Sequence, residues 1–150
     1  MIEDNLVREL AGETLLQALA LTSYLRDHGL PPVQVGENSW QVVFKEETIC
    51  NMWLATSLEP ITLFIWPYFD GSHETDTSQI DEHMKRIARQ HVNPCTTGHC
   101  ASNPGIRQYI FGQQFENICT APIAFTNPSR EEIDCIQVLL ELRVAELSEM

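Results

Sequence analysis

The chain has 150 residues, the usual size of one domain, and its 43% hydrophobic and 20% charged side chains are ordinary for a globular protein. No segment reaches the roughly 18 consecutive apolar residues of a membrane span, and the sequence begins without a basic and apolar leader. We therefore expect one cytoplasmic domain over residues 1–150. The formal net charge of −12 disfavours nucleic acid and anionic membranes as partners, because both attract lysine and arginine. A cationic partner suits this charge better.

The first predicted element is a helix over residues 3–28, where leucines recur at near-helical spacing. Gly12 weakens its middle and is expected to form a kink or a break. Gly29 stands where a helix often ends, and Pro31 and Pro32 prevent any continuation.

Three strands are predicted next, over residues 39–47, 48–58 and 61–69. Their β-branched and aromatic residues favour strands, and the short connections predict an antiparallel meander. The stretch "ITLFIW" is apolar at every position after its threonine, so we expect a central strand that is covered on both sides.

A polar loop over residues 70–78 leads to a second predicted helix, which begins at a capping box from Ser78 to Asp81 and runs to about His91. The apolar stripe of this helix predicts that His91 lies on its buried side. Residues 107–119 are expected to form one strand, or two short strands that turn near Gly112.

The last predicted helix begins with Asn127 as its cap and Pro128 at its first helical position, and it runs to about Leu147. The element order is thus α-β-β-β-α-β-(β)-α. This order predicts an α+β fold, in which an antiparallel sheet (a three-strand meander plus one or two later strands) packs against N-terminal, middle and C-terminal helices.

The segment "QHVNPCTTGHCASNPG", residues 90–105, concentrates histidine and cysteine between glycines and prolines. Thiolates and imidazoles are the usual ligands of zinc, and glycine and proline allow a tight turn around an ion. Cys95 and Cys100 are separated by four residues, a spacing found in zinc sites. The predicted zinc ligands, with His99 as the alternative member, are His91, Cys95, His99, Cys100 and Cys119.

The same segment allows other interpretations. Cys95 and Cys100 could form a disulfide, or they could be ordinary thiols, while His91 contacts the last carbonyl groups of its helix. Three protein ligands and an open position would make the 91–100 loop the centre of a small metal- or cysteine-dependent enzyme. Four protein ligands would make the metal structural. The odd total of five cysteines, with no leader sequence, argues against a secreted disulfide framework.

The aromatic residues of the predicted strands are expected to form core and cross-strand contacts. If some stand on an open face of the sheet, they would provide a platform for a ligand or a peptide. Trp66, Tyr68 and Phe69 are the candidates for a pocket mouth or a dimer surface.

These observations predict an acidic binding or interaction domain, with a zinc ion clamped by the cysteine-histidine loop as an optional structural element. Its partner would be a protein or a small molecule. In element order, size and acidity the chain resembles the small dimeric secretion chaperones that hold unfolded segments of effector proteins. This resemblance implies a homodimer with a protein partner.

Overall fold

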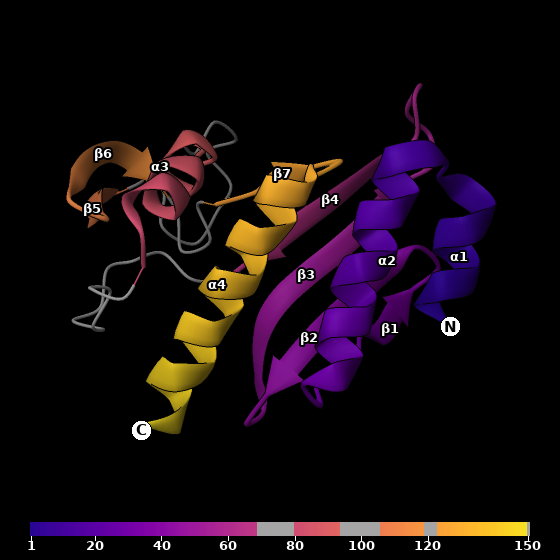
Figure 1. The fold of residues 1–150 in the computed structure, drawn as a ribbon, viewed down its shortest axis with the longest axis horizontal. Coiled ribbons are helices and arrows are strands. Elements are labelled where there is room, and N and C mark those ends of the chain that lie inside the picture. Colours follow the sequence, from indigo (N-terminus) through magenta and orange to yellow (C-terminus); the bar gives the residue numbers. More distant parts are fainter. Residues whose placement is uncertain (69–79, 94–105, 119–122, 150) are drawn as a thin grey trace.

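The computed structural model describes residues 1–68, 80–93, 106–118 and 123–149. Over these residues it confirms the predicted α+β class, with helices and an antiparallel sheet in one assembly (Figure 1). The elements in chain order are α1 (Ile2–Glu9), α2 (Gly12–Asp27), β1 (Val33–Gly36), β2 (Ser39–Phe44), β3 (Glu47–Ala55), β4 (Thr62–Pro67), α3 (Glu82–Gln90), β5 (Ile106–Ile110), β6 (Gln113–Ile118), β7 (Phe125–Thr126) and α4 (Arg130–Ser148).

The larger sheet has five strands in the order β1-β2-β3-β4-β7, and every neighbouring pair is antiparallel. The predicted meander is therefore present as β2, β3 and β4. Met52 lies opposite Trp40 on one side and Ile65 on the other, so these three side chains share a face. The alternation of buried and partly exposed residues along β2 and β4 divides the sheet into an inner and an outer face.

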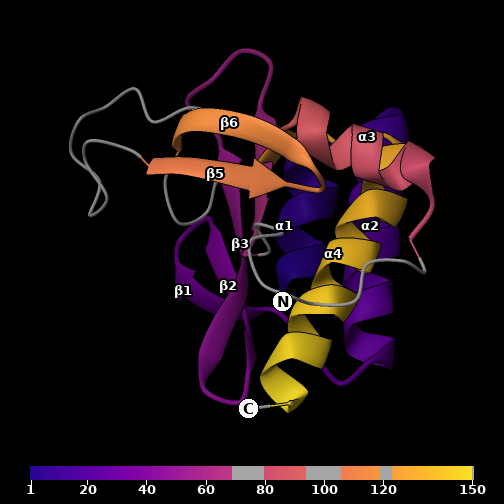
Figure 2. The ribbon, with the colours of Figure 1, turned by 90° about the vertical axis from the view of Figure 1, so that its left-hand side faces the viewer.

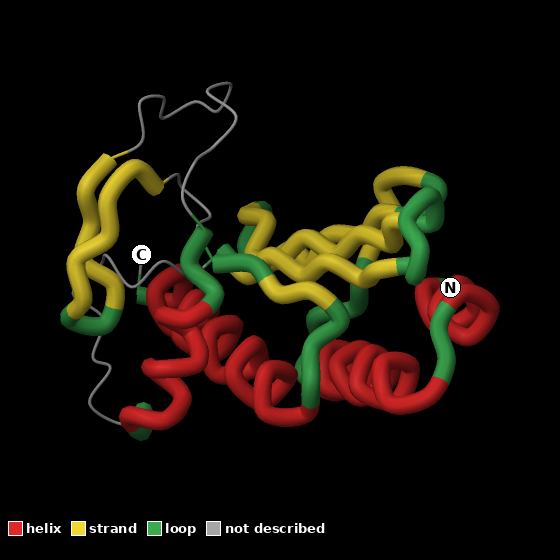
Figure 3. Tube along the Cα trace, turned by 90° about the horizontal axis from the view of Figure 1, so that it is seen from above, coloured by secondary structure: helices red, strands yellow, loops and turns green. Residues whose placement is uncertain are grey.

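The helices α1, α2 and α4 lie along the inner face, and Figure 3 shows them below the strands. The core forms between these two layers because apolar side chains of both are removed from water there. Its largest members that are fully buried are Trp40, Phe125, Ile2, Leu6, Leu21, Leu25, Ile49, Met52, Leu54, Leu63 and Ile65.

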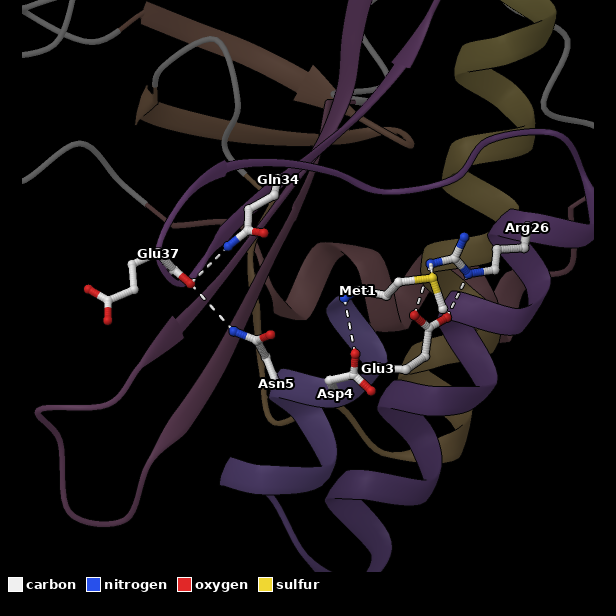
Figure 4. Close-up of polar contacts among 7 residues, drawn as sticks. All are labelled: Met1, Glu3, Asp4, Asn5, Arg26, Gln34 and Glu37. Atoms are coloured by element: carbon white, nitrogen blue, oxygen red, sulfur yellow. Dashed lines mark hydrogen bonds and ion pairs between the residues drawn. The ribbon is translucent and has the colours of Figure 1, made fainter.

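The N-terminal segment forms two helices, which confirms the second of the two outcomes expected at Gly12, a break. Leu10 and Ala11 are extended, and Gly12 has φ +61°, a conformation that glycine adopts without steric cost. The break lets α1 turn back against α2, where Arg26 donates to both carboxylate oxygens of Glu3 at 2.6 and 2.8 Å (Figure 4).

The edge strand β1 was not predicted, because "VQVG" is short and follows two prolines. Its position is fixed from the helix side. The carbonyl oxygen of Glu37 accepts hydrogen bonds from Gln34 at 3.2 Å and from Asn5 of α1 at 3.4 Å, as Figure 4 shows. Val33 and Val35 are 54% and 57% exposed on this strand.

The helix α3 and the β5–β6 hairpin lie together at the end of the molecule away from α1 (Figures 1 and 2). Arg89 joins them by donating to the carbonyl oxygen of Phe111 at 2.9 Å. The hairpin turns at Phe111 and Gly112, which both have positive φ, and this confirms the second of the two predicted alternatives. The cap of α3 is Asp81, whose side chain accepts from the Met84 amide, while Ser78 lies outside the described residues.

The predicted cap of the last helix was wrong by two residues. Ser129 and Glu132 form the capping box of α4, in which each side chain accepts from the other's backbone amide. Asn127 has φ +43° and instead accepts, through its side-chain oxygen, a hydrogen bond of 2.8 Å from the Leu63 amide. The asparagine thus joins the start of α4 to β4.

Candidate functional site

His91 ends α3 and is partly buried between α3, β7 and α4. Its Nδ1 lies 2.8 Å from the carbonyl oxygen of Ile87, its Nε2 pairs with the carboxylate of Glu132, and its ring stacks on Phe125 with centroids 4.3 Å apart. As placed, both ring nitrogens have protein partners. A metal ion bound to His91 would therefore have to replace one of these two contacts.

The other predicted zinc ligands, Cys95, His99, Cys100 and Cys119, lie outside the described residues. The zinc, disulfide and enzyme interpretations of the 91–100 loop thus stay predictions. Among the residues that the structure does describe, no group of three or more histidine, cysteine, aspartate or glutamate side chains is arranged to hold a metal ion.

Two cysteines are described, and both are free and buried. Burial raises the pKa of the Cys50 thiol to about 12, and burial together with the Glu132 carboxylate raises the pKa of Cys135 to about 12. Because the thiolate is the nucleophilic form, these two thiols are poor nucleophiles at neutral pH. Their position in the core makes them packing residues.

The outer face of the larger sheet is the most distinctive surface of the described structure. Figure 3 shows α1, α2 and α4 on the opposite side of the sheet, and no helix among the described residues lies on this face. Cross-strand pairs define two rows of side chains on it. One row runs Ser39, Trp53, Phe64 and Thr126, and the other runs Val33, Gln41, Asn51 and Trp66.

The aromatic side chains of this face form a continuous stack across β3 and β4. Phe64 lies between Trp53 and Trp66, with ring centroids 5.2 and 5.6 Å apart and interplanar angles of 21° and 12°. Trp53 is 42% exposed, and Phe64 and Trp66 are partly exposed. The expectation that "ITLFIW" forms a central strand is confirmed, because β4 lies between β3 and β7, whereas its outer side chains are partly exposed and not fully covered.

The outer face is nearly free of charge, although the chain carries a net charge of −12. Glu47, at the beginning of β3, is the single charged residue in the five strands. The polar but uncharged side chains of Gln41 and Asn51 lie between Trp66 and Val33 at the edge. One of them, Asn51, donates to the hydroxyl of Tyr68, and burial raises the pKa of this tyrosine.

A hollow lies between α2, β2 and α4, where the Tyr24 hydroxyl donates to a Glu141 carboxylate oxygen at 3.0 Å. Its volume is about 180 Å³. Ligand sites in proteins usually have roughly 300–1,000 Å³. Another hollow, between the start of α3 and α4, has about 370 Å³ and is therefore not excluded by its size. The outer face is the stronger candidate for a binding surface because of its aromatic stack.

Of the residues predicted for a ligand or dimer surface, Trp66 and Tyr68 lie at the end of β4 beside the outer face, and Phe69 lies outside the described residues. The strand aromatics were expected to form core and cross-strand contacts, or a platform if on an open face; Trp53 and Phe64 form such a cross-strand pair, and the exposure of Val33 and Val35 was not predicted. A two-residue alternation was the signal available, because Met52 and Leu54 face the core and Trp53 must point the other way.

Comparison of the chain with protein-family models, with curated protein sequences and with solved structures gives no significant match. The resemblance to secretion chaperones thus rests on element order, size and acidity. No helix in the described parts of the chain has both the length and the apolar character that crossing a membrane requires.

Proposed function

We propose that this chain is a protein-interaction domain that binds a partner protein through the outer face of its five-stranded sheet. The observation that carries the proposal is the stack of Trp53, Phe64 and Trp66 on a face that no described helix covers. Tryptophan is among the residues most enriched where binding energy is concentrated in protein interfaces.

The composition of the face supports this role. The centres of protein interfaces are depleted in charged residues and enriched in aromatic residues. The strands of this face carry one charged residue, Glu47, in a chain that is 20% charged. A large apolar patch on a soluble protein usually marks an interaction site. The neutral outer face therefore differs from the acidic remainder of the surface in the way that an interface would.

The proposal can be tested by selecting binders from a library of random displayed peptides with the wild-type protein. Each selected peptide is then titrated against the double variant Trp53→Ser, Phe64→Ser. The control is Val7→Ser, Leu16→Ser, which removes apolar side chains that are 60% and 61% exposed on the helices α1 and α2. Circular dichroism of both variants shows whether the fold is kept.

We expect the selected peptides to bind the control like the wild type and to bind the face variant at least ten-fold more weakly. This loss corresponds to about 1.4 kcal/mol or more, a modest share of what an interface tryptophan contributes. The proposal would be contradicted if the peptides bound the folded double variant Trp53→Ser, Phe64→Ser with the same affinity as the wild type. A selection that yields no binders would also contradict it.

A structural zinc ion in the 91–100 loop is compatible with this role, since a metal with four protein ligands stabilises a fold without taking part in chemistry. Elemental analysis of the purified protein tests this part of the proposal. A stoichiometric metal that is lost in Cys95→Ser and Cys100→Ser, with a lower melting temperature, would support it. A metal-free protein with freely titrating thiols would exclude it.

A further inference from the structure

We infer that the partner segment of the outer face is cationic, with apolar side chains that lie on the aromatic stack and with lysine or arginine side chains that reach the two ends of the strands. This inference rests on the proposed function and specifies its partner. It is carried by the distribution of charge around the face, which is acidic at both ends and neutral in the centre.

Carboxylates stand at each end of the meander. Glu37 follows β1 and Glu59 precedes β4 at one end, and Glu46 in the Lys45–Glu46 turn and Glu47 at the start of β3 lie at the other. All four residues are exposed. Figure 4 shows the Glu37 carboxylate pointing away from α1, while its backbone oxygen accepts the hydrogen bond from Asn5 of that helix.

These four carboxylates have no basic partner within the part of the chain that the structure describes. Five of the basic side chains there are already paired with other acids, as in Arg26–Glu3, Arg89–Glu82 and Arg107–Glu116. Lys45 is the one basic residue between positions 29 and 68, and its Nζ donates to the carbonyl oxygen of Leu147 in α4. It is thus engaged on the helix side of the sheet.

The length of the strands sets the length of the segment. A strand rises roughly 3.3 Å per residue, so the six residues of β4 extend over about 20 Å. An extended segment of about seven residues therefore covers the stack and brings both of its ends to the acidic turns. Side chains of such a segment alternate between its two faces, so apolar residues at every second position can all face the stack while the basic residues at its two ends reach the acidic turns.

A second copy of the chain fits this face less well than a cationic segment. If the outer faces of two molecules packed together, the acidic strand ends of one would lie against those of the other and would repel them. Each molecule also carries a net charge of −12. Pairing through the β1 edge is also hindered, because β1 has four residues, contains a bulge between Gln34 and Gly36 and follows Pro31 and Pro32. Short strands, bulges and prolines are features that protect sheet edges from pairing.

The test uses two synthetic peptides of seven residues, one of alternating lysine and leucine and one of alternating glutamate and leucine. Each is titrated into the protein by isothermal calorimetry at two salt concentrations. One variant replaces Glu37, Glu46, Glu47 and Glu59 by glutamine. The matched control replaces four exposed acids of the helix layer, Glu13, Asp27, Asp134 and Glu149, by their amides, and so changes the net charge equally.

We expect the lysine peptide to bind at least ten-fold more tightly than the glutamate peptide, and salt to reduce this difference. The glutamine variant should lose most of the preference, and the helix-layer control should keep it. Equal binding of both peptides, or equal loss in the two variants, would overturn the inference. If library peptides that depend on Trp53 and Phe64 show no excess of basic residues, the cationic partner is refuted while the proposed function stands.

Analytical ultracentrifugation of the protein alone completes the test. We expect the mass of a single chain from micromolar to high concentration. A dimer that dissociates in the Trp53→Ser, Phe64→Ser variant would show that a second copy occupies the face, and this result would refute the cationic segment.

Discussion

Replacing Trp53 by alanine should cost little stability if the outer face of the sheet is open, whereas replacing Trp40 should cost much more. Trp40 is 2% exposed in the core, and Trp53 is 42% exposed on the outer face. Truncation of a buried aromatic side chain costs about 3–5 kcal/mol. A little over half of the Trp53 side chain is buried, so its truncation removes about half as much buried surface, together with one stacking contact. We expect this to cost about 1–2 kcal/mol.

Urea denaturation followed by circular dichroism measures both changes in the free energy of unfolding. In a domain of this size, about 1 kcal/mol shifts the melting temperature by roughly 2–4 °C, so the two variants are easily separated. Trp53→Phe, which keeps an aromatic ring opposite Phe64, should recover part of the loss. Iodide should quench the fluorescence of Trp53 far more than that of Trp40, since iodide does not enter a packed core.

A loss of 3 kcal/mol or more in Trp53→Ala, close to the loss in Trp40→Ala, would refute the reasoning. It would mean that the outer face is packed against another part of the same chain, because only full burial makes truncation that costly. The binding surface would then be occupied from within the molecule.

Three further predictions concern other parts of the structure. Cys50 and Cys135 should react with a thiol reagent at pH 8 only after unfolding. Folding raises the pKa of each thiol to about 12, so their contribution to the free energy of unfolding is fully present at neutral pH and falls as the pH rises. A urea titration at pH 10 should show a loss of about 1 kcal/mol per thiol. Cysteine-to-serine variants at both positions should flatten this alkaline loss. Asn127→Ala should lower the free energy of unfolding by about 1–3 kcal/mol, because it leaves the Leu63 amide without its acceptor and keeps a positive φ. Asn127→Asp keeps an acceptor oxygen and should retain most of the stability. Equal losses in the two variants would contradict this role. The hydrogen bond to Arg26 holds the pKa of Glu3 below its ordinary value, so the contribution of this ion pair to the free energy of unfolding is present at neutral pH and is lost as the pH falls through the pKa of Glu3 in the folded protein. Arg26→Gln should remove this contribution, which is under about 1 kcal/mol for so exposed a pair. An unchanged dependence of stability on acidic pH in this variant would contradict the prediction.

Much of the fold could be predicted from the sequence because periodicity records which side chains face the core. The alternation through Trp40, Val42, Met52 and Leu54 gave the meander, and the helical spacing of Ile133, Ile136 and Leu140 gave the last helix. Local choices were less predictable. Asn127 was expected to cap α4, but its side chain bonds to β4, a contact between residues far apart in the sequence.

The candidate surface could be predicted only in part. The sequence indicated that Trp66 and Tyr68 could contribute to a surface, but an apolar strand such as "ITLFIW" has the same pattern whether its second face is buried by a helix or left open. The distinction depends on which face of the sheet the helices pack against, and α1, α2 and α4 all pack against the same face. The exposure of Val33 and Val35 likewise depends on β1 being the edge strand, which needs the complete strand order.

The most direct measurement is a ¹⁵N nuclear magnetic resonance titration with the lysine–leucine peptide, observed at the indole N–H groups of the three tryptophans. Trp53 and Trp66 stand on the outer face, and Trp40 lies in the core between the sheet and the helices. We predict that the signals of Trp53 and Trp66 shift on binding while that of Trp40 stays in place, with the affected amides in β2, β3 and β4. Shifts confined to the helices, or no shift at Trp53 and Trp66 when the peptide binds, would contradict the assignment of the outer face as the binding surface.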